Sequence, residues 1–445
     1  MSFIRSVAVL VSGTALGHGI TAAALPVLSR LNSPADFSLL AVFAALVSIL
    51  SVGACLRFDI AISLPSNKDE ALRVFALAVM SAACFALVLC VLTPFASLTA
   101  ARLTSQPKLG SYLWLVPFAV LMAAVYSALQ AWFVREKNFD LIARSRVVQS
   151  ASSTGVQIGL GIGGMTPFGL IFGSVLNAGS ACIRLGIEFC RNNQFKQLRQ
   201  LITLKEMRVT FRKYDQFPKY STVEALCNSA ALHVPLIMIA ALAIGPEAGY
   251  LTLAMTAMQA PMSLFGTAVG QVYISYAANE HRDGSLGRFT ADTLGKLLWS
   301  GVGPILAAGI LAPRMFSWIF GQEWERAGWL VAWMTPWFVM QFLASPLSLA
   351  LHVAGKQRFA LILQVFGLVL RVSAIWLAYA VGQSLGEAYA IANFLFYALH
   401  LIIILKIVKV SSIYILETAT KPALVILAWL ITAVGLSLFL SYVAK

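Results

Sequence analysis

Long apolar runs dominate the sequence, and short segments that carry charge, proline or glycine separate them. The apolar positions do not alternate with polar ones, and the runs are longer than a buried strand, so we expect helices. About 20 apolar residues are enough for a helix to cross the hydrocarbon layer of a membrane. The breaks predict thirteen spans, at residues 7–28, 38–57, 72–98, 111–134, 147–165, 167–190, 220–243, 249–276, 294–318, 327–353, 359–381, 385–407 and 421–443.

The composition agrees with this pattern. Of the 445 residues, 59% are hydrophobic and only 11% are charged, and the mean hydropathy is +0.82. Within a bilayer, only helices and closed barrels satisfy the backbone polar groups. The unalternating runs favour the helix, so the sequence predicts an all-α polytopic membrane protein.

The basic residues predict how the chain is oriented. Most of the 32 lysines and arginines fall in the segments on one side of the predicted spans, and the richest segment runs from Arg191 to Lys219. Such a bias marks the cytoplasmic side and places the N-terminus in the cytoplasm. The net charge of +14 is thereby explained by topology and by anionic lipid head groups, without a nucleic-acid partner.

Two halves of the chain resemble each other weakly. SPADFSLLAVF opens the second span and GPEAGYLTLAM the eighth, while NFDLI and RFALI lead into the fifth and the eleventh. A duplicated unit of six helices would place the two copies in one orientation, with the transport pathway between them. We therefore expect a six-helix lobe at residues 1–190, a cytoplasmic linker at 191–219, a second lobe at 220–408 and an additional helix at 409–445.

Six segments in order resemble one family of transporters. These are GTALGHGITAAALPVLSRLNSPADF, LRFDIAISLPSNKDEA, FPKYS, GTAVGQVYISYAANE, IFGQEWERAG and FLASPLSLALHVAGKQR. Over residues 1–407 the chain is similar to the Wzx-type polysaccharide exporters of the MOP superfamily, the O-antigen and capsule flippases of bacteria. Two features depart from the family pattern: His18 stands where a glutamine is expected, and the run at 421–443 exceeds the usual twelve spans.

The resemblance implies a fold and a function. The expected fold has two six-helix lobes in a V shape around a central cavity. The expected function is translocation of an undecaprenyl-pyrophosphate-linked oligosaccharide from the cytoplasmic to the outer leaflet of the bacterial inner membrane. A polysaccharide polymerase and a chain-length regulator are the expected protein partners.

Such a cargo calls for cations that can bind a pyrophosphate. Arg371 is the best candidate, because it lies near the middle of a span with no carboxylate at that depth to pair with. An unpaired charge there costs roughly 3 kcal/mol and is normally kept for a cavity, a partner or a substrate. The other candidate cations are Arg57, Arg30, Lys219 and Arg184.

These other cations also have ordinary interpretations. Arg30 and Arg57 lie near span ends, where their side chains can reach the head groups. Arg184 precedes Glu188 by four residues, a spacing that favours a local ion pair over a substrate contact.

Neutral polar and aromatic residues are candidates for binding the sugars. The amides in or near the spans are Gln130, Gln149, Gln157, Asn177, Asn228, Gln259, Gln271, Gln341, Gln364 and Asn393. Trp114, Trp333 and Trp337 could stack on sugar rings, although anchoring at the interface is the commoner role of such residues.

Four further residues are candidates for gating and energy coupling. Asp59 could pair with a cytoplasmic basic residue and hold a gate closed, or form an ordinary loop ion pair. Glu224, His18 and His233 are the groups that could bind a coupling proton. The sequence leaves proton coupling, sodium coupling and no coupling open.

Several chemistries are disfavoured by the sequence. It has neither a Gly-x-x-x-x-Gly-Lys loop nor a His-Glu-x-x-His pair, and its six cysteines have the spacing of packing residues, so we expect no cofactor and no metal. The glycines of GVQIGLGIGG predict close helix packing. A lipid II flippase and a multidrug exporter would share the fold, and a membrane enzyme of polysaccharide assembly is the more distant alternative.

Overall fold

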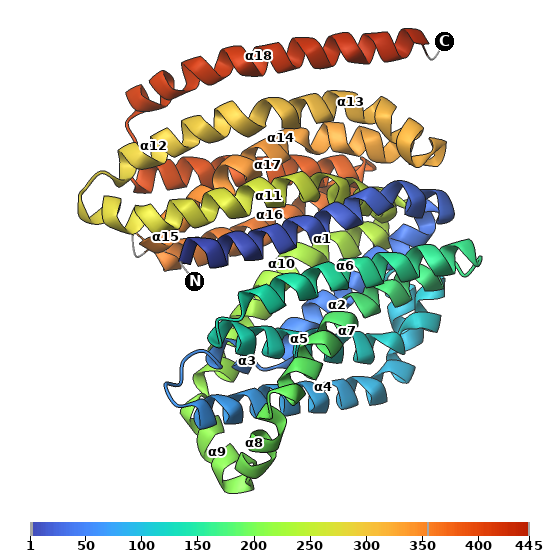
Figure 1. The fold of residues 1–445 in the computed structure, drawn as a ribbon. Coiled ribbons are helices and arrows are strands. Elements are labelled where there is room, and N and C mark those ends of the chain that lie inside the picture. Colours follow the sequence, from blue (N-terminus) through green and yellow to red (C-terminus); the bar gives the residue numbers. More distant parts are fainter. Residues whose placement is uncertain (1–2, 354–355, 444–445) are drawn as a thin grey trace. The chain divides into compact units, whose positions relative to one another are not determined.

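The computed structural model describes residues 3–353 and 356–443, and within these ranges the chain is helical and has no strand. Two compact units are distinguished by packing, residues 1–249 and 250–445, and each is described by itself. The first unit holds α1 (Phe3–Leu31), α2 (Pro34–Ala54), α3 (Phe58–Ala61), α4 (Lys68–Leu103), η1 (Pro107–Tyr112), α5 (Leu115–Arg135), α6 (Phe139–Ile162), α7 (Phe168–Arg191), α8 (Gln194–Leu201), α9 (Leu204–Lys213), η2 (Phe217–Ser221) and α10 (Thr222–Leu242) (Figure 1).

The second unit holds most of α11 (Glu247–Arg282) and the helices that follow it. These are α12 (Leu286–Leu297), η3 (Leu298–Val302), α13 (Gly303–Phe320), η4 (Gln322–Trp324), α14 (Glu325–Leu347), α15 (Leu349–Val353), α16 (Gln357–Val381), α17 (Leu385–Ile407) and α18 (Ser412–Val443). A helix lies over each of the thirteen spans that the apolar runs predict. Among the described residues, ten segments are long and apolar enough to cross a membrane, so the chain is a multi-pass membrane protein.

The predicted span 147–165 falls in α6, which is not among these ten segments. The predicted spans 7–28 and 249–276 fall in α1 and α11, whose side chains lie partly outside the described residues. In α6, serine, threonine and glutamine interrupt the apolar positions between Gln149 and Gln157. A helix of this kind needs neighbours on its polar face, and α6 packs between α1 and α7.

Small residues bring these helices together. A Cβ atom on Gly13 of α1 would lie 2.7 Å from the Cα atom of Ala143 in α6, so only glycine permits this approach. The glycine motif at the end of α6 packs closely on another helix at only part of its length. Gly155 and Gly159 face open space, and Gly161 is the one of the three that packs on another helix, against Leu31.

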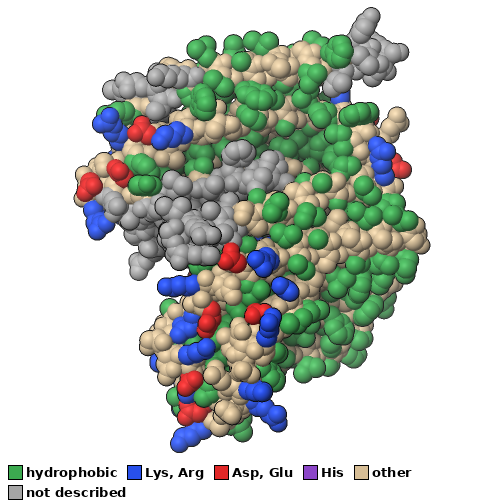
Figure 2. All heavy atoms as spheres, in the orientation of Figure 1, with side chains coloured by type: hydrophobic (Ala, Val, Ile, Leu, Met, Phe, Trp, Pro, Cys, Tyr) green, Lys and Arg blue, Asp and Glu red, His purple; other side chains and the backbone are tan. Residues whose placement is uncertain are grey.

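The charged end of the first unit holds α3, α8 and α9. Figure 2 shows basic and acidic side chains gathered there, whereas hydrophobic side chains cover the sides of the helices. Two ion pairs fasten α9 to the first turns of α4: Arg73 Nη1 lies 2.5 Å from Glu206 Oε2, and Lys213 pairs with Glu70. The hydroxyl of Tyr214 also donates to Glu70 Oε1, at 2.9 Å. The linker is therefore fixed to the helical bundle of its own unit.

In the second unit, α14 packs between α13 and α17, and α16 packs on α17. The buried core joins Leu297, Phe342, Leu347 and Ile404 from several of its helices. The additional helix α18 lies along α12 and α13, where Arg314 donates to Ser437.

The predicted lobe boundaries at residues 190 and 219 separate α10 from the first lobe. In the structure α10 packs on α2, and the division between the compact units falls after Gly249. The predicted lobes are copies of a repeated six-helix unit, whereas the compact units are defined by packing alone. The lobe boundaries therefore stay a prediction.

Candidate functional site

A polar cavity of about 300 Å³ lies within the first unit. Five helices contribute to it: α1, α2, α5, α6 and α7. Its lining is Thr21, Phe43, Ala44, Val47, Ser48, Ala119, Ser153, Thr154, Gln157, Ser174 and Asn177. Seven of these eleven side chains are hydroxyls or amides, and none carries a charge.

Helical spacing places these polar groups together. Ser153, Thr154 and Gln157 lie on one face of α6, and Ser174 and Asn177 are three residues apart on the facing side of α7. Two of the side chains join the helices, because Ser153 Oγ donates to the carbonyl of Gly173 at 2.8 Å and Gln157 Nε2 to that of Leu170 at 3.2 Å. The cavity walls are thus fixed by cross-helix hydrogen bonds.

Several polar atoms remain available to a ligand. The side chains of Ser48, Thr154 and Asn177 form no hydrogen bond with the described residues. Hydroxyls that already donate to a backbone carbonyl, such as Ser153, keep lone pairs that can accept. The cavity can therefore both donate to and accept from a neutral polar ligand.

A cation that the sequence analysis did not select lies in the same helices. Arg146 of α6 is half-buried, and its Nη1 donates to Thr14 Oγ1 of α1 at 2.6 Å. Its Nε is buried and has no partner. Tyr126 of α5 and His18 of α1 lie close enough to feel its charge. In the sequence, Arg146 lies in a basic segment that is predicted to be cytoplasmic, and this position gives no sign that its side chain faces into the unit.

Arg57 and Asp59 lie at the break between α2 and α3. Leu56 and Arg57 both adopt left-handed backbone conformations, with φ of 49° and 58°, which side chains other than glycine rarely adopt. Asp59 is only 7% exposed, and its Oδ2 accepts a hydrogen bond from Ser127 Oγ at 2.7 Å. The Oδ1 atom of Asp59 and the Nε atom of Arg57 are buried without partners.

The ion pair that could hold Asp59 in a closed gate is not formed. Within the described residues, no basic side chain lies within ion-pair distance of its carboxylate, and the neutral hydroxyl of Ser127 takes that place. Asp59 is thus a buried acid with only one of its two oxygens hydrogen-bonded, and it follows a strained stretch of backbone at Leu56 and Arg57. Such strain is often found at functional sites.

Arg371 lies deep inside the second unit, where it is 2% exposed. Its Nε donates to Asn393 Oδ1 of α17 at 2.8 Å, and its guanidinium carbon lies 4.4 Å from the centre of the Phe396 ring. Its Nη1 is buried without a partner. Other buried polar atoms of this unit are in the same condition, because Trp337 Nε1 and both ring nitrogens of His400 also lack partners. Among the described residues, an amide and an aromatic ring therefore hold the guanidinium, and no carboxylate does.

The remaining predicted residues are more ordinary. Arg30 is exposed in the last turn of α1, and Lys219 is exposed in η2, where it pairs with Asp215. Arg184 is exposed on α7, and the local ion pair with Glu188 that the spacing favours does not form.

The candidates for energy coupling also lie apart. Glu224 is exposed on α10, and His18 is exposed on α1. His233 of α10 is half-buried, with Nδ1 2.9 Å from the carbonyl of Ser229 in the same helix. The structure brings together Gln157 and Asn177 of the predicted amides, but none of the five predicted cations lines the cavity.

Comparison with known families gives this site its context. A family model described as "Polysaccharide biosynthesis protein" matches residues 27–328, which is more than half of the chain. The chain belongs to this family. The match covers α2, α5, α6 and α7, which line the polar cavity, but only the last turn of α1, and it reaches into α14. No curated protein sequence matches the chain.

Solved structures show the fold. The lipid II flippase MurJ in an inward closed conformation matches with a TM-score of 0.72 at 12% identity, over 99% of this chain and 98% of that chain. An inward-facing multidrug resistance MATE family transporter of the MOP superfamily matches with a TM-score of 0.58 at 12% identity, over 93% and 97%. A mutant of the Vibrio cholerae MATE transporter VcmN gives 0.55 at 12% identity, over 92% and 97%.

The all-α MOP fold expected from the sequence is thereby confirmed. The chain is therefore a polysaccharide biosynthesis protein whose fold is the one that these solved transporters have.

Proposed function

We propose that this chain is a flippase that moves undecaprenyl-pyrophosphate-linked oligosaccharide repeat units from the cytoplasmic to the periplasmic leaflet of the bacterial inner membrane by alternating access. The family supports a role in polysaccharide biosynthesis, and the fold supports transport. The chemistry of the polar groups inside each unit supports this choice of substrate.

The uncharged polar cavity is the observation that carries the proposal. A glycan presents many hydroxyl groups, which donate and accept hydrogen bonds, and it has no need of a charged partner. Seven hydroxyl and amide side chains in an otherwise apolar bundle match that requirement. A cationic drug would instead favour a carboxylate, and the described lining contains none.

The pyrophosphate needs cations, and arginine suits phosphate oxygens because its planar fork donates two parallel hydrogen bonds. In the first unit, Arg146 and Arg57 each keep a buried donor without a partner. In the second unit, Arg371 does the same. We assign Arg146 and Arg57 to the pyrophosphate of a substrate that has its glycan in the polar cavity, and Arg371 to the anionic cargo at a later stage of transport.

Asp59 is the residue we assign to coupling with a proton or sodium gradient. It is buried, and one oxygen of its carboxylate has no partner, so it can bind a proton or a small cation without breaking an existing ion pair. An Asp59→Asn variant should transport at a rate that no longer depends on the gradient. A rate that keeps its dependence would remove Asp59 from this role.

The test begins with a strain that lacks the protein. We expect a complete lipid-linked repeat unit to accumulate in the lipid extract, detected by mass spectrometry and inaccessible from the periplasm, while the surface polymer disappears. Accumulation of lipid II, or of periplasmically accessible repeat units, would contradict the proposed substrate or the proposed step.

Variants then connect this activity to the cavity. Thr154→Val and Asn177→Leu remove polar atoms from the lining at almost constant volume, and each should restore much less surface polymer than the unmodified protein. Thr99→Val makes the same change as the first variant on the exposed face of α4 and serves as its control. Equal restoration by all three variants would show that the cavity does not bind the cargo.

A further inference from the structure

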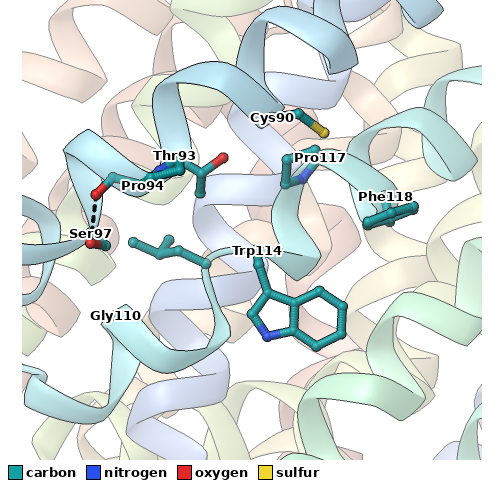
Figure 3. A pocket seen from close by; sticks show the side chains of 9 residues that line it. Cys90, Thr93, Pro94, Ser97, Gly110, Trp114, Pro117 and Phe118 are labelled. Atoms are coloured by element: carbon teal, nitrogen blue, oxygen red, sulfur yellow. Dashed lines mark hydrogen bonds between the residues drawn. The ribbon is translucent and has the colours of Figure 1, made fainter.

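A second hollow lies on the outside of the first unit, between α4, η1 and α5. We call it the α4–α5 notch, and it has a volume of about 320 Å³. Its lining is Cys90, Thr93, Pro94, Ser97, Gly110, Leu113, Trp114, Pro117 and Phe118 (Figure 3). The notch lies at the end of α4 that is opposite the α9 attachment.

A proline lies in the helix at the hollow. Pro94 lies inside α4 and has no N–H group for the carbonyl four residues earlier, so one backbone hydrogen bond of the helix is missing at this turn. At Gly110, η1 is in ordinary contact with α4, because a Cβ atom at this position would lie 3.5 Å from the carbonyl oxygen of Ser97.

The inside of the notch suits hydrocarbon. Its two hydroxyls are already used within α4: Thr93 donates to the carbonyl of Leu89, and Ser97 Oγ donates to that of Pro94 at 2.9 Å. The rings of Trp114 and Phe118 pack edge to face, with 6.5 Å between their centres. A polar ligand would find few partners here, whereas an acyl chain needs none.

The surroundings of the notch face the lipid. Phe95 is 80% exposed and Leu98 is 71% exposed on the same part of α4. Trp114 is 56% exposed, as is usual for an aromatic residue at the level of the head groups. The notch is therefore reached from the membrane and not from the interior of the unit.

Two cations lie just beyond the notch. Arg102 is exposed in the last turn of α4, next to Ala101, which is in contact distance of the Gly110 position. Lys108 is exposed in η1, two residues before Gly110. Neither has an ion-pair partner among the described residues, and the sequence contains no acidic residue between Glu70 and Glu136. Arg102 and Lys108 are thus two cations without an ion-pair partner among the described residues at this end of α4.

We propose that the α4–α5 notch binds one anionic glycerophospholipid, with an acyl chain in the notch and the phosphate between Arg102 and Lys108. An unfilled hollow in contact with lipid would be filled by a chain in any case. The two unpaired cations select an anionic head group by electrostatic attraction. With the orientation predicted from the basic residues, the bound lipid belongs to the periplasmic leaflet.

The experiment places a photoreactive benzophenone side chain at Phe118 in the full chain. The protein is reconstituted into vesicles of phosphatidylcholine with a minor fraction of phosphatidylglycerol and illuminated, and the mass of the adduct identifies the lipid. We expect phosphatidylglycerol adducts roughly tenfold above its fraction in the vesicle. The same label at Ile183, which is exposed on α7, a helix that contributes no residue to the notch, should report the bulk composition.

Two double variants provide the decisive comparison. Arg102→Gln with Lys108→Gln should bring the adduct at position 118 down to the bulk fraction. Lys196→Gln with Arg199→Gln removes the same charge from α8 and should leave the enrichment unchanged. Enrichment that is absent in the parent protein, or that survives loss of Arg102 and Lys108, would overturn the proposal. So would exclusive labelling of polyprenyl phosphate when that lipid is added.

Discussion

The guanidinium of Arg371 lies over the ring of Phe396, with 4.4 Å between the guanidinium carbon and the ring centre. A cation–π contact of this kind is worth about 2 kcal/mol or more when it is desolvated. Together with the hydrogen bond to Asn393, it replaces the carboxylate that the sequence lacks at this depth. A charge that a membrane interior would normally exclude is thereby kept in place by neutral groups, and α16 is joined to α17.

The contact with Asn393 gives a first prediction. Asn393→Leu removes the acceptor of Arg371 Nε and should lower the free energy of unfolding by about 1–3 kcal/mol, because a buried charged donor loses its partner. Arg371→Met removes the charge as well as the donor and should cost less. The double variant should therefore lose less stability than the sum of the losses in the two single variants. Thermal unfolding of the purified protein measures this coupling, and additive losses would contradict it.

Two arginines on α6 give a second prediction. Arg146 faces α1 and keeps a buried donor, whereas Arg144, half a turn earlier, is exposed. Arg146→Ala should reduce surface polymer at least tenfold, since one charge-assisted hydrogen bond to phosphate is worth about 1.5–3 kcal/mol. Arg144→Ala should leave polymer nearly unchanged. The comparison requires equal protein in the membrane, measured by immunoblot, and similar losses in both variants would argue against a phosphate contact.

Glycine packing gives a third prediction. Gly13→Ala should destabilise the first unit, because the new Cβ atom would meet the backbone of Ala143. Gly155→Ala should be neutral or should stabilise α6 by roughly 0.5–1 kcal/mol, since the position is open and alanine favours the helix. Thermal unfolding of the two variants distinguishes these effects. A stabilised Gly13→Ala protein would show that the α1–α6 contact is looser than described.

Alkaline pH gives a fourth prediction. Burial, together with the neighbouring Glu70 carboxylate, raises the pKa of Tyr214 to about 12, above its ordinary value of 10. The folded protein therefore holds this proton between pH 10 and 12, while the unfolded chain loses it. The stability that Tyr214 contributes should be complete below pH 10 and fall as the pH rises toward 12.

Tyr214→Phe is the matched variant for this effect, because it removes only the hydroxyl that donates to Glu70. Its unfolding temperature should depend less on pH between 10 and 12 than that of the unmodified protein. Identical pH dependence of the two proteins would exclude Tyr214 as the source. The ion pair between Lys213 and Glu70 remains in both.

Much of the fold was predictable because the membrane restricts the options. The apolar runs identify segments that lie in helices, and run 385–407 coincides with α17. The partners of the charged side chains were harder to predict. Lys219 is bound to Asp215, Arg184 does not pair with Glu188, and Asp59 accepts from Ser127 and not from a basic residue. Sequence spacing shows which contacts are possible within a helix, but neighbouring helices decide which are made.

The sequence by itself determined that this chain is a helical membrane protein, because hydropathy and backbone hydrogen bonding leave no other structure for such long apolar runs. It also determined that Arg371 lacks a carboxylate partner, since no acid occurs at its depth. Only the tertiary structure decided that Gln157, Asn177 and the hydroxyls of α2, α6 and α7 line one cavity, and that Arg146 faces inward. The physical reason is that a helix presents its residues around a full turn, and packing against α1, α5 and α7 selects the face that is enclosed.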